Sequence, residues 1–269
     1  IRTRLVGSEM CIRDRARELL YQVETECARV GLGLNAKKTK AMYINTGVEP
    51  ITTITGSDIA QALTESGDQD FRYLGAWCDK SRDIQTRKAQ AWQALNKMVK
   101  IWKSDLANTL KLRFFRATVE TILLYGCATW SLTKAEEKSL DGTYTRMLRK
   151  VYNMDGRYNI TNSELYGSLS LISDTMKSRR LKLAGHTFRD KTSPAHLTVT
   201  WDPQHGSMSR GRPSTTFVDS LLRDTGLNNT AELEACMADR DLWRCLSSRC
   251  QNTSLSLIHI SEPTRRVLI

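Results

Sequence analysis

The sequence has no long apolar run, and no stretch of it approaches the roughly 18 residues that a membrane-spanning helix needs. Its first residues, IRTRLVGSEM, lack the apolar segment of a secretory signal. The seven cysteines include no C-x-x-C pair, which argues against a zinc ribbon or a thioredoxin-like redox site. We therefore expect no membrane association, and reduced thiols as in proteins of the nucleus and cytoplasm.

Residues 31–40, GLGLNAKKTK, have the composition of a phosphate-binding loop but lack its defining glycines. A Walker A loop requires a glycine directly before its Lys-Ser/Thr pair, and none precedes Lys38-Thr39. A dinucleotide-binding fingerprint needs three glycines after a strand, whereas here two glycines follow a helical pattern. From these residues alone, the stretch is a polar turn between a helix and a strand.

Basic residues are in clear excess, with 40 Lys and Arg against 29 Asp and Glu, a formal charge of +11 and a pI near 9.4. Such an excess favours a polyanionic partner, most often nucleic acid. The alternative is a basic surface that only keeps the protein soluble. The 269 residues, 40% of them hydrophobic, indicate one or two globular domains with a sizeable core.

The two ends of the sequence share a property that back-translation reveals. One DNA sequence can encode residues 5–15, LVGSEMCIRDR, and its reverse complement then encodes residues 255–264, LSLIHISEPT. This DNA resembles the adapter of a transposase-based sequencing library, read once on each strand. We interpret residues 1–15 and 255–269 as translated adapter and exclude them from fold reasoning, as one excludes a fusion scar. The alternative is a genuine strand in LSLIHI; under the first interpretation the chain is a fragment of a longer protein.

The interior predicts a short mixed region followed by long helices, an α+β fold that is mainly α-helical. Apolar residues recur at helical spacing over residues 16–30 and again through most of the chain after residue 80. Short strands are expected within residues 40–45, 51–54 and 71–79. A loop-rich segment, 192–216, holds three prolines and precedes a last helical segment, 216–250.

The helices after residue 80 combine an apolar stripe with a basic side. Their first stripe consists of Trp92, Leu95, Val99, Trp102 and Leu106. The cations away from the stripes are Lys88, Lys97, Lys100, Lys103, Lys111, Arg113 and Arg116. Cations at helical spacing are what tracking a nucleic-acid backbone requires, because phosphates supply affinity without sequence information. For each single cation, a solvated surface charge is the alternative.

Five segments follow one another along the chain: GLGLNAKKTKAMYIN, FRYLGAWCD, LLYGCATWSLT, KSRRLKLAGHTFR and GRPSTTFVDSLLRDTGL. Together and in this order they resemble the reverse transcriptases of non-LTR (LINE-like) retrotransposons. One departure is Ala128, where many relatives carry Glu. The resemblance implies that residues 16–80 are the remnant of a polymerase palm, 81–200 a helical thumb and connection, and 201–254 a basic loop with C-terminal helices.

The resemblance also implies roles for individual residues. Lys38 would lie close to the incoming nucleotide and protonate the leaving pyrophosphate. Tyr73, Leu74 and Gly75 would form the primer grip, which holds the 3′ end of the growing strand. The further residues expected to contact an RNA/DNA primer–template duplex are Lys37, Lys40, Lys97, Lys100, Lys103, Lys111, Arg113, Arg116, Arg179, Arg180, Arg210 and Arg212.

The catalytic acids of the family are missing. Its Tyr/Phe-x-Asp-Asp motif, which holds Mg²⁺ on the nucleotide, should precede the helix at residue 16 and is absent. The acid pairs Asp68-x-Asp70 and Asp239-x-Asp241 are expected to be salt-bridged surface. We therefore expect Mg²⁺ and an endonuclease in the parent protein, no metal bound by this chain, and no polymerisation by the chain alone.

Two smaller motifs and two other functions stay open. Arg210-Gly211-Arg212-Pro213 matches the core of an AT-hook but lacks the flanking basic residues, which favours a plain loop. A zinc site is the less favoured use of a set consisting of Cys236, Cys245, Cys250, His186, His196 and His205. The alternatives to a polymerase fragment are a non-enzymatic helical nucleic-acid-binding protein and the non-functional product of a decayed element.

Overall fold

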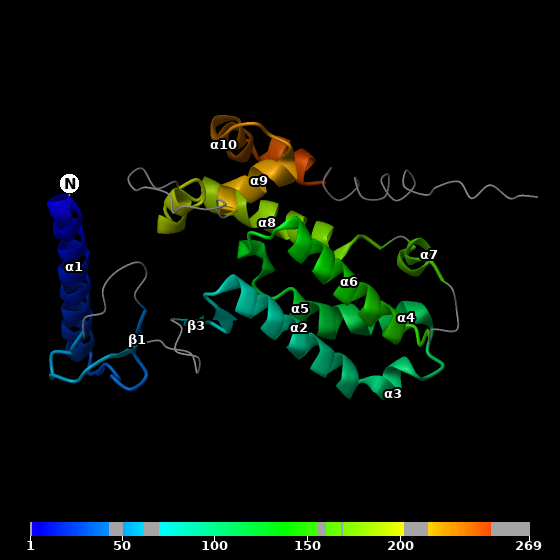
Figure 1. The fold of residues 1–269 in the computed structure, drawn as a ribbon, viewed down its shortest axis with the longest axis horizontal. Helices are drawn as coiled ribbons and strands as arrows, with labels where there is room; N and C mark the ends of the chain where they lie inside the picture. Colours follow the sequence, from blue (N-terminus) through cyan, green and yellow to red (C-terminus); the bar gives the residue numbers. More distant parts are fainter. Residues whose placement is uncertain are drawn as a thin grey trace, which may run out of the picture. The chain divides into compact units, whose positions relative to one another are not determined.

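The structure is a computed structural model (Figure 1), and it divides into two compact units, residues 1–83 and 84–269. For residues 2–15 only the helical backbone is described. The described residues are 2–42, 51–61, 70–154, 160–167, 169–201 and 215–248.

The first unit begins with a long helix, α1 (Arg2–Arg29), that ends at a glycine. Gly31 adopts φ 75°, a left-handed conformation that suits glycine because it has no Cβ. The backbone N–H of Leu32 then donates to the carbonyl of Cys27 at 2.9 Å, and that of Gly31 to Ala28 at 3.1 Å. This pair of bonds is a Schellman cap, so the first glycine of GLGLNAKKTK serves to stop the helix.

Two short strands follow α1 and pair in parallel: β1 (Lys40–Ala41) and β2 (Ala60–Gln61). Residues 51–59 form a tight loop before β2. A hydrogen bond from the Ile59 N–H to the Ile51 carbonyl at 2.9 Å closes this loop. The Glu24 carboxylate accepts from the Ile54 N–H at 2.7 Å, which connects this loop to α1. The strand expected at 51–54 is reduced to a single bridge between Thr52 and Asp58. Part of the strand expected at 40–45 lies outside the described residues.

The strand and turn expected at 71–79 form an antiparallel hairpin. Its strands are β3 (Arg72–Tyr73) and β4 (Ala76–Trp77), which pair with Tyr73 opposite Ala76. The hairpin leads directly into α2 (Lys80–Lys97), which begins in the first unit and continues into the second.

The second unit is helical throughout its described residues. After α2, its elements are α3 (Val99–Trp102), α4 (Asn108–Phe115), a π-helical turn η1 (Arg116–Glu120), α5 (Thr121–Leu123), a 3₁₀ turn η2 (Cys127–Thr129), α6 (Lys134–Val151), α7 (Asn162–Tyr166), α8 (Ile172–Arg189), a 3₁₀ turn η3 (Pro194–Thr198), α9 (Phe217–Thr225), α10 (Thr230–Ala238) and a last helix over 240–248.

The larger core of this unit lies between α2, α4, α6 and the first half of α8. Leu95, Phe115, Met147 and Leu148 are fully buried in it. α6 begins at a capping box in which Thr133 and Glu136 satisfy each other's backbone N–H groups. Its buried positions then recur at helical spacing, as in an amphipathic helix with one side against the core.

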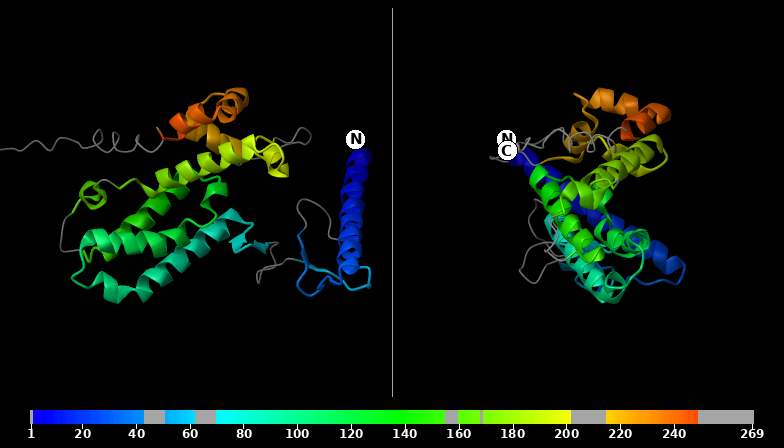
Figure 2. Two further views of the ribbon diagram at one scale, coloured as in Figure 1. Left: turned by 180° about the vertical axis from the view of Figure 1, so that it is seen from behind. Right: turned by 90° about the vertical axis from the view of Figure 1, so that its right-hand side faces the viewer.

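A second core joins the end of α8 to α9, α10 and helix 240–248. Leu181, Leu221, Leu233 and Trp243 are buried there. Figure 2 shows α9 and α10 above α8 in both views, with α2 and α4 below it. α8 is thus the element shared by both cores.

The expected fold class is confirmed: the protein is mainly α-helical, with two two-stranded sheets among its described residues. Among these residues, no helix is long and apolar enough to cross a membrane. Cys27, Cys78, Cys127, Cys236 and Cys245 are free thiols.

Candidate nucleic-acid interface

The basic turn after α1 is shaped by Asn35. Its side-chain oxygen accepts from the Lys38 N–H at 3.2 Å, and its carbonyl accepts from the Thr39 N–H and the Thr39 hydroxyl, each at 3.0 Å. An asparagine that bonds the backbone ahead of it in this way fixes a turn. Lys37, Lys38 and Lys40 are all exposed around it. The turn therefore presents three cations to solvent without using backbone amides to cradle a phosphate.

The tip of the β3–β4 hairpin presents two apolar side chains to solvent. Leu74 and Gly75 are its two central residues, with φ of 47° and 89°. Positive φ at both positions defines a type I′ turn, which normally carries Asn-Gly or Gly-Gly. Leu74 is 76% exposed and Tyr73 64% exposed. A leucine in a left-handed conformation at an exposed tip works against local stability, and such outliers concentrate at binding sites.

Two buried carboxylates hold the base of this hairpin against the start of α2. Asp70 accepts from the backbone N–H groups of Phe71 at 2.8 Å and Asp79 at 3.1 Å, and from the Arg82 guanidinium at 3.3 Å. Asp83, 1% exposed, accepts from the Trp77 N–H at 3.1 Å. The Arg82 guanidinium also lies 3.8 Å from the centre of the Trp77 ring. The exposed tip is thus carried on a rigid base.

The expectation for Asp70 needs a correction. We expected a surface salt bridge, but the carboxylate is buried at 7% exposure, because it closes the hairpin as well as pairing with Arg82. Its oxygens are occupied by N–H donors and a guanidinium, so Asp70 does not fit the ligand set of Mg²⁺. Its companion, Asp68, lies outside the described residues.

Both members of the second acid pair are exposed, as expected, and Asp241 forms a salt bridge. Asp239 accepts from the backbone N–H groups of Asp241 and Leu242, and Asp241 lies 3.6 Å from Arg244. Among the described residues, no group of three His, Cys, Asp or Glu side chains could hold a metal ion. The zinc set is described only in part, since Cys250 and His205 lie outside.

Five of the predicted cations form an exposed series along α2, α3, α4 and η1. They are Lys97, Lys100, Lys103, Arg113 and Arg116. Arg116 lies 3.8 Å from Glu120 but keeps about half of its side chain exposed, at 52%. Lys88 differs because desolvation, and then the nearby Arg146, lower its pKa, and it donates to the Ser139 hydroxyl at 2.9 Å. The exposed series therefore begins at the end of α2.

Lys111, expected at the interface, is instead buried. It is 6% exposed and donates to the Trp102 carbonyl at 2.9 Å. That bond satisfies a backbone group at the end of α3, so the lysine connects α3 to α4. Its ammonium is not presented to a ligand in this structure.

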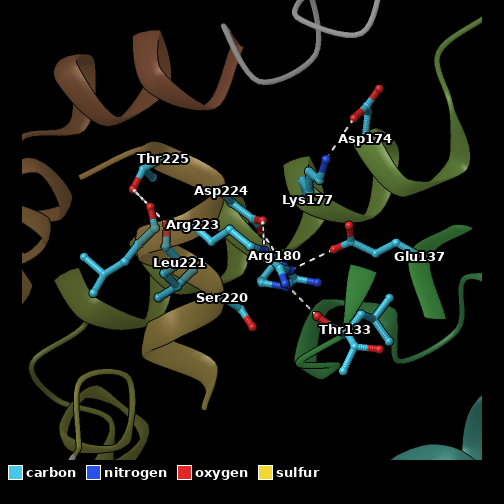
Figure 3. Close-up of polar contacts among 12 residues, drawn as sticks. Thr133, Glu137, Asp174, Lys177, Arg180, Ser220, Leu221, Arg223, Asp224 and Thr225 are labelled. Atoms are coloured by element: carbon cyan, nitrogen blue, oxygen red, sulfur yellow. Dashed lines mark hydrogen bonds and ion pairs between the residues drawn. The ribbon is translucent and has the colours of Figure 1, made fainter. Parts of the chain in front are cut away.

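Arg180, also expected at the interface, is fully buried. Figure 3 shows it between α8 and α9, where it donates to Asp224. The neighbouring Arg223 donates to Glu137 and to the Leu132 carbonyl, each at 2.8 Å. These bonds are internal, so Arg180 leaves the candidate interface.

Arg179, next to Arg180, stays exposed and donates to the Leu124 carbonyl at 3.4 Å. The remaining predicted cations, Arg210 and Arg212, lie outside the described residues together with their AT-hook-like motif.

Two cations that the sequence analysis left out lie beside the exposed series. Arg149 and Lys150 occupy the last turn of α6 and, with Lys103, line a pocket of about 110 Å³. The Lys150 ammonium donates to the Asn96 side chain at 2.6 Å, next to Lys97. The sequence RMLRKV does place two adjacent cations at the end of a predicted helix. The sequence around them, however, does not indicate that they lie next to α3.

Comparison with known proteins points to a transposon origin. The chain is 25% identical over 222 residues to an uncharacterized transposon-derived protein of Caenorhabditis elegans, covering 78% of this chain and 79% of the worm protein. No protein-family model matches the chain, and no solved structure matches it significantly.

Proposed function

We propose that this chain is part of an RNA-directed DNA polymerase of a non-LTR retrotransposon and that its role there is to hold the primer–template duplex. The similarity to a transposon-derived protein suggests the origin of the sequence. The order of five family-like segments supports the specific kind of element.

The hairpin tip is the observation that carries this proposal. Leu74 lies in the two-residue turn and Tyr73 directly precedes it; both are exposed, and Asp70 and Asp83 fix the base of the hairpin. An exposed aromatic ring can stack on a base or ribose, which suits contact with a nucleic-acid strand. A primer grip needs such a tip on a rigid support, because it must hold the strand end in one position.

The exposed cations of the second unit support the same role. These exposed cations lie on consecutive helical elements of the chain: Lys97, Lys100, Lys103, Arg113 and Arg116. Cations arranged in this way contact phosphates, so they give affinity that falls as salt rises. In the proposed polymerase, this is the contribution of the thumb.

The apolar side of α1 is consistent with a polymerase palm that continues beyond this sequence. Leu19, Val23 and Val30 are 55%, 49% and 72% exposed. We propose that further palm strands, carrying the Mg²⁺-binding acids, cover this side in the parent protein. Lys38 would then face the nucleotide, but only together with the Mg²⁺-binding acids of the parent protein.

The test is binding of the whole chain to a labelled RNA–DNA hybrid, measured by fluorescence anisotropy over a range of salt concentrations. We expect binding that weakens linearly in log–log form with salt, and no primer extension when Mg²⁺ and deoxynucleotides are added. Heparin serves as a control polyanion. Equal affinity for heparin and hybrid, or no binding at all, would contradict the proposal.

A non-enzymatic nucleic-acid-binding protein is the second candidate. It is favoured by a helical unit that has two buried cores of its own. Long-read sequencing of the source DNA separates the two candidates. A reading frame that continues upstream into Tyr/Phe-x-Asp-Asp supports the polymerase, and a start codon near residue 16 supports the binding protein.

A further inference from the structure

A pocket at the joint between α3 and the end of α6 gathers three cations. Lys103 enters it from the end of α3, and Arg149 and Lys150 from the last turn of α6. The volume is about 110 Å³, several times the roughly 30 Å³ that one water occupies in the liquid. No acidic side chain is among the described residues that line it.

The two α6 cations are held in place by neutral partners. Lys150 donates to Asn96 at 2.6 Å and lies 6.0 Å from the centre of the Trp92 ring. Arg149 donates through Nη2 to the Ile160 carbonyl at 2.9 Å and to Asn162 at 3.1 Å. These acceptors are uncharged, so the two side chains keep their full positive charge. The bonds also restrict the side-chain conformations, so a bound ligand would have less conformational freedom to restrict.

A simpler explanation covers only part of the arrangement. Basic residues in the last turn of a helix complement the negative end of its dipole, which accounts for the sign of Arg149 and Lys150. It does not account for Lys103, which belongs to another element and faces the same pocket.

We propose that Lys103, Arg149 and Lys150 form a binding pocket for one phosphate of a nucleic-acid backbone. This inference rests on the proposed nucleic-acid binding and names the place where it is concentrated. A guanidinium and two ammonium groups around one anion provide charge-assisted hydrogen bonds from several directions. A backbone phosphate, rather than free phosphate, is the ligand because exposed Lys100 precedes Lys103 by one helical turn and would meet an adjacent phosphate of the same strand.

The experiment compares two double variants of the whole chain that remove the same charge. Lys103→Gln with Lys150→Gln alters the pocket, and Lys134→Gln with Lys138→Gln alters exposed lysines at the opposite end of α6. Binding to a short double-stranded DNA is measured by anisotropy as salt is varied. One lost phosphate contact lowers the salt slope by about 0.9, so the pocket variant should lose up to about 0.9 and the control much less.

Single Lys103→Gln guards against a folding artefact, because this exposed side chain has no hydrogen-bond partner among the described residues. It should weaken binding in the same direction as the double pocket variant, by a smaller factor. If the wild type binds DNA and the pocket and control variants lose equal affinity, the pocket assignment is overturned while nucleic-acid binding stands. If the wild type binds neither this DNA nor the RNA–DNA hybrid, both proposals fail; if it binds the hybrid alone, the same variants are compared on the hybrid.

An NMR titration with inorganic phosphate distinguishes the two sources of the anion. The indole N–H of Trp102, which lines the pocket, is the reporter. We expect DNA to shift this signal at concentrations where inorganic phosphate does not. A shift with inorganic phosphate that DNA fails to reproduce would show that the pocket serves free phosphate and would overturn the proposal.

Discussion

Arg180 on α8 donates to the carboxylate of Asp224 on α9, and the two side chains are 0% and 1% exposed. The adjacent Arg223 lies 3.7 Å from the same Asp224 carboxylate and pairs with Glu137 on α6 at 2.8 Å (Figure 3). α9 is therefore attached both to α8, which the two cores share, and to α6, which belongs to the first core. Consecutive residues of one short helix connect the two cores.

Replacing one member of the buried pair should be severe. Arg180→Met removes the buried guanidinium from the buried Asp224 carboxylate and leaves it the longer pair with Arg223 at 3.7 Å, so we expect the free energy of unfolding to fall by about 3 kcal/mol. Arg180→Met with Asp224→Leu should recover most of this loss, because both charges are then removed. Urea unfolding measures both variants. Arg244→Ala, which breaks the exposed pair with Asp241, is the control and should cost at most about 1 kcal/mol.

Asp141 should make stability fall as pH rises. Burial raises its pKa above the ordinary 3.8, although the backbone N–H of Ser173 donates to it at 3.0 Å. The folded state then holds its proton to higher pH than the unfolded chain does, so ionisation costs stability from pH 3.8 upward through the folded pKa. Asp141→Asn keeps the acceptor oxygen and removes the charge.

We therefore expect Asp141→Asn to be more stable than the wild type at neutral pH, with the difference disappearing below pH 3.8, the ordinary pKa. Denaturant unfolding at a series of pH values gives both curves. A variant that is less stable at neutral pH would mean that the charge at the start of α8 helps more than burial costs.

Gly185 on α8 is required by the close approach of Trp243. A Cβ at this position would lie 2.3 Å from the indole Nε1, which donates to the Leu181 carbonyl at 2.8 Å. Gly185→Ala should destabilise the protein by about 1–3 kcal/mol, as overpacking does, despite alanine's higher helix propensity. Gly142→Ala on α6 is the matched control. Nothing lies within 4 Å of a Cβ there, so the same change should stabilise by about 1 kcal/mol.

The sequence predicts the helical unit well because its signal is local. Leu95 and Trp102 recur at helical spacing, and both are buried as expected. The hairpin around Leu74 also follows from a local pattern of strand residues and a turn glycine. The strand expected at 51–54 is largely absent, because a β-rich run becomes a strand only where a partner is available for pairing.

The errors at the candidate interface share one physical cause. Helical spacing shows that Lys111 and Arg180 lie off the main apolar stripe, but not what lies against them. Arg180 is buried because Asp224, 44 residues later, meets it through the tertiary fold. The pocket of Lys103 and Lys150 is hidden from sequence for the same reason, since its members come from separate helices.

Leu74 should contribute to nucleic-acid affinity while lowering the stability of the hairpin. Replacing it with Asn, which tolerates φ 47° better, should stabilise the hairpin by about 1 kcal/mol, since a left-handed conformation costs an ordinary residue about that much. If the tip contacts a primer strand, the same variant should bind an RNA–DNA hybrid more weakly. Thermal unfolding and anisotropy are measured on one preparation. Increased stability with unchanged binding would remove Leu74 from the interface.

The first unit should open more readily than the second. Leu19 and Val23 of α1, and Val30 directly after it, are 55%, 49% and 72% exposed, whereas Leu95 and Phe115 of the second unit are fully buried. Local opening costs little where few apolar contacts are lost, so amides of 16–80 should exchange with solvent faster than those of α2, α4 and α6. Hydrogen exchange followed by mass spectrometry gives the order directly. Slower exchange in α1 than in α6 would mean that its apolar side is covered, which would contradict the view that it awaits further palm strands.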